Sequence, residues 1–141
     1  MYFGTGVSPF YRGYRLYDED IPASKALVQK WTAFNNRYRV VLHADIVHLR
    51  RADGNGMDAM LHVQPEPTKS KERAFLMLFN QNPHVAVNTT LRVPLYYSGL
   101  STAANVTRGD GHSFVLPLAR DWSIRLPVRM APNSFAWYAI E

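Results

Sequence analysis

Turn signals divide the chain after residue 50 into short apolar segments. Gly, Asn, Asp and Pro cluster at Asp53-Gly54-Asn55-Gly56, at Asn80-Gln81-Asn82-Pro83 and at Arg108-Gly109-Asp110-Gly111. Strand-length segments separated in this way, about 8–12 residues apart, are typical of antiparallel sandwiches and barrels. No long helical pattern recurs in this region, which argues against βαβ units.

We therefore expect an antiparallel β-sandwich of about seven or eight strands. Residues 74–79 form a continuous apolar run of strand length, and in 85–95 the apolar residues take alternate positions on one face. The remaining expected strands lie at 57–63, 104–107, 113–118, 123–129 and 135–140, and residues 43–49 form a connection or a further short strand.

One amphipathic α-helix is expected to precede the strands. Apolar residues recur at three- and four-residue steps from Leu27 to Leu42. Ser24 can cap the helix, and Pro22 disfavours an earlier start. We place this helix at about residues 24–42, with Trp31 on its core-facing side. Trp137, in the last strand, also fits a core position.

Three of the expected strands contain a proline, namely Pro94, Pro117 and Pro127. Proline cannot donate a hydrogen bond to a neighbouring strand, so each should lie at a sheet edge, a bulge or a crossover. Prolines at edges also protect a sandwich against unwanted strand pairing.

The composition limits the class of protein. The 141 residues fit one domain, and 47% hydrophobic residues exclude a disordered chain. The lack of cysteine excludes disulfides, Cys-ligated metals and thiol catalysis, but does not specify a compartment. No apolar run approaches about 18 residues and the N-terminus lacks a signal-peptide pattern, so we expect neither a transmembrane segment nor a signal peptide.

The chain is expected to have three parts, at residues 1–23, 24–50 and 51–141. The first part is unusually aromatic for a chain terminus, with Tyr2, Phe3, Phe10, Tyr11, Tyr14 and Tyr17. We expect it to pack against a further domain or to mediate self-association. The net charge of +5 comes mostly from scattered arginine, which favours ion pairs over a nucleic-acid surface.

Candidate catalytic and metal-binding groups are few. Asp18-Glu19-Asp20 precedes the helix, where acidic residues favour the helix dipole, and Asp53 and Asp58 flank a turn without completing a calcium loop. His43, Asp45 and His48 are the only compact His/Asp group, and their spacing matches no zinc motif. We expect no catalytic residue, no metal site and no cofactor.

The sequence resembles the end of a glycoside-hydrolase catalytic barrel followed by its C-terminal all-β domain. The barrel end is resembled by residues 10–18 and, after the Trp31 helix, by 38–39 and 45–54. The β-domain is resembled by 78–83, by 93–100 and by the closing segment 127–137. Barrel strands with catalytic carboxylates are absent, so the resemblance implies an accessory domain or a fragment of a longer protein, and it carries over no catalytic residue. We expect a non-catalytic domain that supports a catalytic barrel and contacts carbohydrate.

Exposed aromatic residues are the expected route to carbohydrate or interface contact, because sugar rings stack on Tyr and Trp. Adjacent Tyr96 and Tyr97 should point to opposite faces of a strand, which leaves one of them in the core. A freestanding carbohydrate-binding module is the alternative, and a binder of single-stranded nucleic acid is less favoured. The candidate contact residues are Tyr11, Arg12, Tyr14, Arg15, Tyr96 and Trp122.

Overall fold

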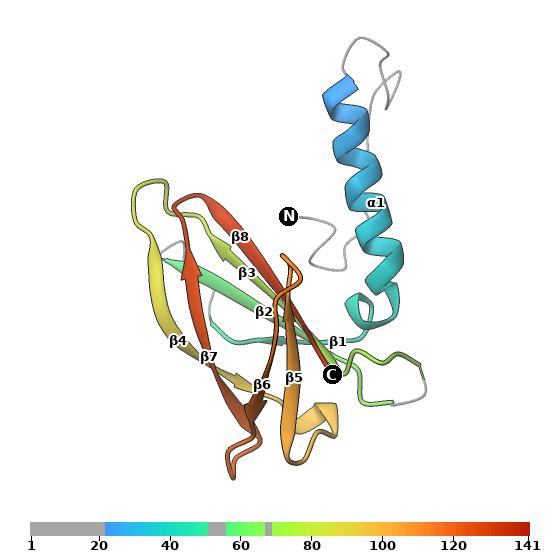
Figure 1. The fold of residues 1–141 in the computed structure, drawn as a ribbon, viewed down its shortest axis with the longest axis vertical. Coiled ribbons are helices and arrows are strands. Elements are labelled where there is room, and N and C mark those ends of the chain that lie inside the picture. Colours follow the sequence, from blue (N-terminus) through green and yellow to red (C-terminus); the bar gives the residue numbers. More distant parts are fainter. Residues whose placement is uncertain (1–21, 51–55, 67–68) are drawn as a thin grey trace.

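The computed structural model describes residues 22–50, 56–66 and 69–141, with side chains from Lys25 onward. Within these residues the protein is mainly β, with eight strands in two antiparallel sheets and one long helix, which confirms the expected fold class. Figure 1 shows the two sheets as separate layers, with the helix standing beside the larger one. The elements in chain order are α1 (Pro22–Leu42), β1 (Asp45–His48), β2 (Met57–Val63), β3 (Ala74–Asn80), β4 (Val87–Pro94), the short 3-10 helix η2 (Tyr96–Ser98), β5 (Ala103–Arg108), β6 (Ser113–Pro117), β7 (Ser123–Met130) and β8 (Ser134–Ile140).

The larger sheet has six strands in the order β1-β2-β3-β8-β5-β6, and the smaller sheet pairs β4 with β7. The sandwich core lies between the two sheets and is formed by buried side chains such as Leu76, Leu78, Leu126 and Tyr138. Strand β3 is buried along its whole length because its two faces meet different partners. Leu76 and Leu78 face the smaller sheet, whereas Phe75 and Met77 face α1. Burial on both faces explains the uninterrupted apolar run.

Helix α1 packs on the outer face of the larger sheet through its C-terminal half. Val41 and Leu42 are fully buried against β3 and β8, and an aromatic cluster extends this contact toward the N-terminal end of the helix. The aromatic packing continues through Tyr38 and Phe34, and the ring centroid of Phe34 lies 5.5 Å from that of Trp137. Figure 1 shows the N-terminal part of α1 projecting past the strands.

The three strand prolines all lie on edge strands, as expected. Strand β6, which ends at Pro117, is the last strand of the larger sheet. Strands β4 and β7 carry Pro94 and Pro127, and each has a free edge because their sheet has only two strands. The missing N–H of each proline therefore needs no partner in a central strand.

The expectation for Tyr96 and Tyr97 is wrong. The two residues lie in η2 rather than in a strand, and both are exposed. Gly99 ends this turn with φ +72°, a conformation that glycine adopts without strain. Ser98 Oγ donates a hydrogen bond of 2.6 Å to the Leu95 carbonyl oxygen, so the single turn is closed locally. Strand periodicity therefore ends at Leu95.

Candidate functional site

Three aromatic side chains meet at one end of the sandwich and remain open to solvent. Tyr96, Tyr97 and Trp122 are 60%, 67% and 44% exposed, and we call them the aromatic platform. The Tyr96 ring centroid lies 5.3 Å from that of Tyr97 and 5.3 Å from that of Trp122, with interplanar angles of 85° in both pairs. Edge-to-face packing of this kind is a favoured aromatic geometry, and it leaves ring faces uncovered.

Two connections bring the platform together. Tyr96 and Tyr97 follow β4, and Trp122 occupies the turn between β6 and β7. The Leu95 N–H donates to the Trp122 carbonyl oxygen at 2.7 Å, and the Trp122 N–H donates to the Ala119 carbonyl oxygen at 2.9 Å. Trp122 has φ +53°, a left-handed conformation that is costly for a residue with a side chain. These bonds hold the indole beside Tyr96.

Arg92 and Asp121 form an ion pair, and Asp121 directly precedes Trp122 of the platform in the sequence. Arg92 Nη2 lies 2.6 Å from Asp121 Oδ2, and Ser123 Oγ donates to Asp121 Oδ1 at 2.7 Å. The hydrogen bond from Ser123 and the one from Arg92 lower the pKa of Asp121 to about 2. Both partners of the ion pair are about half exposed, so they offer hydrogen-bonding groups at the surface, and Asp121 directly precedes Trp122 in the chain.

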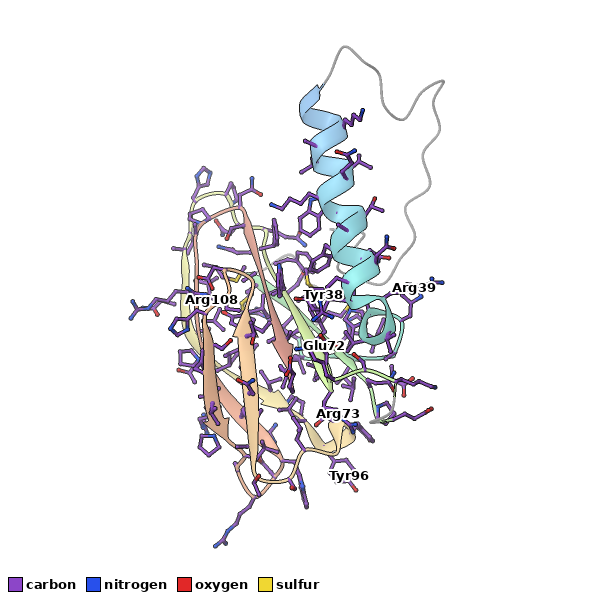
Figure 2. All side chains as sticks on the ribbon, turned by 45° about the vertical axis from the view of Figure 1, so that its right-hand side comes forward. Tyr38, Arg39, Glu72, Arg73, Tyr96 and Arg108 are labelled. Atoms are coloured by element: carbon purple, nitrogen blue, oxygen red, sulfur yellow. The ribbon has the colours of Figure 1, made fainter. Side chains whose placement is uncertain are left out.

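The structure thus brings together two of the residues predicted from the sequence, Tyr96 and Trp122, which lie far apart in the chain. Tyr97 was expected to alternate with Tyr96 and is found beside it instead. The other four candidates, Tyr11, Arg12, Tyr14 and Arg15, lie outside the described residues. Figure 2 shows Tyr96 at the end of the sandwich opposite the projecting end of α1.

A second feature, a cavity of about 450 Å³, lies between α1 and the outer face of the larger sheet. Trp31, expected in the core, lies half-buried at this cavity together with Trp137. Asp110 is the one carboxylate among the described residues that line it. Hydrolysis of a glycosidic bond needs two carboxyl groups, so this lining does not supply that chemistry.

The remaining acidic and histidine candidates are dispersed. His43 lies in the turn after α1 and His48 in β1, both exposed, and Asp58 accepts a hydrogen bond of 3.0 Å from Gln81 Nε2. Across residues 22–50, 56–66 and 69–141, no group of three His, Asp or Glu side chains is arranged to hold a metal ion. Asp53 and the Asp18-Glu19-Asp20 group fall outside the described residues.

Comparison with known proteins adds no family. No known family matches the sequence, and no curated protein matches it either. In the part of the chain that the structure describes, no helix has both the length and the apolar character needed to cross a membrane.

Proposed function

We propose that this chain is a non-catalytic accessory β-sandwich domain of a glycoside-hydrolase-like protein, which supports a catalytic barrel and contacts carbohydrate through the aromatic platform. The observation that carries the proposal is the exposure of Tyr96, Tyr97 and Trp122 in one cluster. Large apolar rings gathered at the surface are typical of binding sites rather than of plain solvated surface.

Sugar chemistry suits this cluster. The faces of pyranose rings that carry C–H groups stack on Tyr and Trp rings, while their hydroxyls need donors and acceptors nearby. Asp121, which precedes Trp122 in the chain, and its ion-pair partner Arg92 can form hydrogen bonds with those hydroxyls. The perpendicular rings of Tyr96 and Trp122 would engage two neighbouring sugar units of a bent chain rather than one flat surface.

The supporting role is proposed for the side of the molecule that carries α1. The N-terminal part of the helix projects past the strands in Figure 1, and Leu27 on it is 56% exposed. An apolar side chain on a projecting helix is suited to contact with another domain. The residues before and within this helix are among those that resemble the end of a barrel. We therefore place the barrel on that side of the molecule.

Affinity electrophoresis in gels that contain soluble polysaccharides tests the platform. The panel should include xylan, glucomannan, β-glucan, starch and pectin, with the unsubstituted chain beside Tyr96→Ala and Trp122→Ala. We expect retardation on at least one polysaccharide, weakened roughly tenfold by either substitution, which corresponds to about 1.4 kcal/mol. Val115→Ala, which removes exposed apolar surface from β6, is the control. Lack of retardation on every polysaccharide would refute carbohydrate binding by the aromatic platform.

A freestanding carbohydrate-binding module is the second candidate, because the same platform supports it. Analytical ultracentrifugation separates the two. An accessory domain without its barrel leaves apolar surface uncovered and should self-associate as concentration rises. A clean monomer at high concentration that still binds polysaccharide would favour the module.

A further inference from the structure

The cavity between α1 and the larger sheet has a lining unlike that of the aromatic platform. Its walls come from α1, from β8, from the end of β5 with the turn that follows it, and from Arg129 of β7. Its volume of about 450 Å³ falls in the range of small-ligand sites, about 300–1,000 Å³. Trp31 and Phe34 line the helix side, whereas Phe135 and Trp137 line the sheet side. It is therefore an aromatic cavity, suited to the apolar face of a ring.

The aromatic walls are held in place by packing. The Trp137 ring stacks on Phe75, with centroids 5.4 Å apart and an interplanar angle of 20°, and it also contacts Phe34. On its other flank lies the turn between β5 and β6, where the Gly109 N–H donates to the Trp137 carbonyl oxygen at 3.0 Å. A Cβ atom at Gly109 would lie 2.7 Å from Trp137 Cε2, so only glycine allows this approach. The ring is thus preorganised.

Positive charge exceeds negative charge around the cavity. Lys30, Arg108 and Arg129 line it, and Asp110 is the acidic residue among its described lining. Asp110 accepts hydrogen bonds from the Arg108 guanidinium, one of them 2.9 Å from Nε, and so neutralises that arginine. Lys30 and Arg129 form no ion pair with any described residue. Lys30 Nζ lies 5.9 Å from the centroid of the Trp31 ring, so its charge is held at the aromatic wall.

We infer that this cavity is a second carbohydrate subsite, selective for a sugar that bears a carboxylate, such as a uronic acid. The sugar ring would lie against Trp31 and Trp137, and the carboxylate would be bound by Lys30 and Arg129. This inference rests on the proposed carbohydrate role and names a substrate class for it. An aromatic wall alone would accept neutral sugars equally well, so the two available cations are what select the anion.

Nuclear magnetic resonance titration tests the inference, because the chain has three tryptophans and each site has its own. Trp31 and Trp137 report on the cavity, and Trp122 reports on the platform. The probes are methyl glucuronide and methyl glucoside, which differ only at C6, together with glucose 6-phosphate. Trp→Phe variants assign the three indole N–H signals.

We expect methyl glucuronide to shift the signals of Trp31 and Trp137 and to bind more tightly than methyl glucoside. Lys30→Met and Arg129→Met should each weaken glucuronide binding about tenfold, the usual scale for one charge-assisted hydrogen bond, and should leave glucoside binding unchanged. Lys25→Met, on the same helix, and Arg125→Met, on the same strand, remove equivalent charges outside the cavity and should change neither.

Equal binding of glucuronide and glucoside would overturn the inference, as would full glucuronide affinity in Lys30→Met and Arg129→Met. Tighter binding of glucose 6-phosphate would replace the carboxylate with a phosphate and overturn the stated ligand class. The platform has its own readout. Shifts confined to Trp122 reject the cavity and leave the platform role standing, whereas shifts at Trp31 and Trp137 with no polysaccharide retention reject the platform alone.

Discussion

Arg37 Nη2 lies 3.1 Å from Glu72 Oε1, and this ion pair joins α1 to the segment that leads into β3. The two groups differ in environment, because the Glu72 side chain is 4% exposed and that of Arg37 is 54% exposed. Ser70 Oγ also donates a hydrogen bond to the Glu72 carboxylate. A buried carboxylate that depends on a surface arginine ties the orientation of the helix to the sheet.

Removal of the arginine should therefore destabilise the fold. Arg37→Met leaves the Glu72 carboxylate without its cation, and we expect the free energy of unfolding to fall by about 1–3 kcal/mol. The double variant with Glu72→Gln should recover part of this loss, since no buried charge remains. Arg39→Met, also on exposed helix surface, is the control and should stay within about 0.5 kcal/mol in urea unfolding. Equal stabilities of Arg37→Met and Arg39→Met would contradict the prediction.

The contact between Gly109 and Trp137 gives a second prediction. Gly109→Ala places a methyl group 2.7 Å from Trp137 Cε2, and the ring cannot withdraw because Phe75 stacks on it. We expect a loss of about 1–3 kcal/mol, typical of overpacking. Trp137→Phe makes room for the methyl group, so a double-mutant cycle should show a loss smaller than the sum of the single losses. Strict additivity in thermal unfolding would show that the clash is relieved elsewhere.

Position 122 should separate backbone strain from side-chain contact. Trp122 has φ +53°, and the left-handed conformation costs a residue with a Cβ atom about 1–2 kcal/mol relative to glycine. Trp122→Gly and Trp122→Ala lose the same indole, but only glycine relieves the strain. We expect Trp122→Gly to be the more stable by about 1 kcal/mol, measured as a higher melting temperature. A higher melting temperature for the alanine variant would argue against strain at this turn.

The aromatic cluster under α1 predicts a contrast between two phenylalanines. Phe75 is fully buried between α1 and the sheet, whereas Phe135 is 50% exposed at the rim of the cavity. Phe75→Ala should cost about 3–5 kcal/mol because it opens a hole in packed aromatic surface. Phe135→Ala, the same chemical change, should cost less than half as much in denaturant unfolding. Similar losses would mean that the helix contributes little to the burial of Phe75.

Acid should weaken two local interactions. Hydrogen bonds from Arg108 and Ser123, respectively, lower the pKa of Asp110 and of Asp121 from 3.8 to about 2. A folded-state pKa below the unfolded value stabilises the fold at higher pH, and this contribution is lost as pH falls from about 4 to 2. Asp121→Asn should therefore lose less stability than the unsubstituted chain over that interval. Melting temperatures measured between pH 5 and pH 2 test this, and parallel curves would contradict it.

Local patterns predicted the elements well. The helix was expected at about 24–42 and runs from Pro22 to Leu42, because the three- and four-residue spacing of its apolar residues follows directly from helix geometry. Pro94, Pro117 and Pro127 were expected at an edge, a bulge or a crossover because proline lacks an N–H, and all three lie on edge strands. Alternation failed at Tyr96 and Tyr97, since a turn closed by Ser98 and Gly99 interrupts the strand.

The candidate sites show the limit of such reasoning. Tyr96 and Trp122 were each recognisable as candidate contact residues, but nothing in their local sequence indicates that their rings meet. The cavity was missed because Trp31 and Trp137 were assigned to the core on periodicity. Lys30 adjoins Trp31 in sequence, whereas Arg129 comes from β7 of the smaller sheet. No local signal therefore linked the charges of Lys30 and Arg129.

The sequence by itself determined the mainly β class, the helix before it and the lack of cysteine chemistry, because periodicity, turn residues and composition act over short stretches of chain. The tertiary structure alone decided the division into six and two strands, the packing of α1 on the outer face and the two aromatic sites. These features depend on contacts between residues far apart in the chain, such as Phe34 with Trp137 and Tyr96 with Trp122. Such contacts are selected by packing of the whole domain, which no single segment specifies.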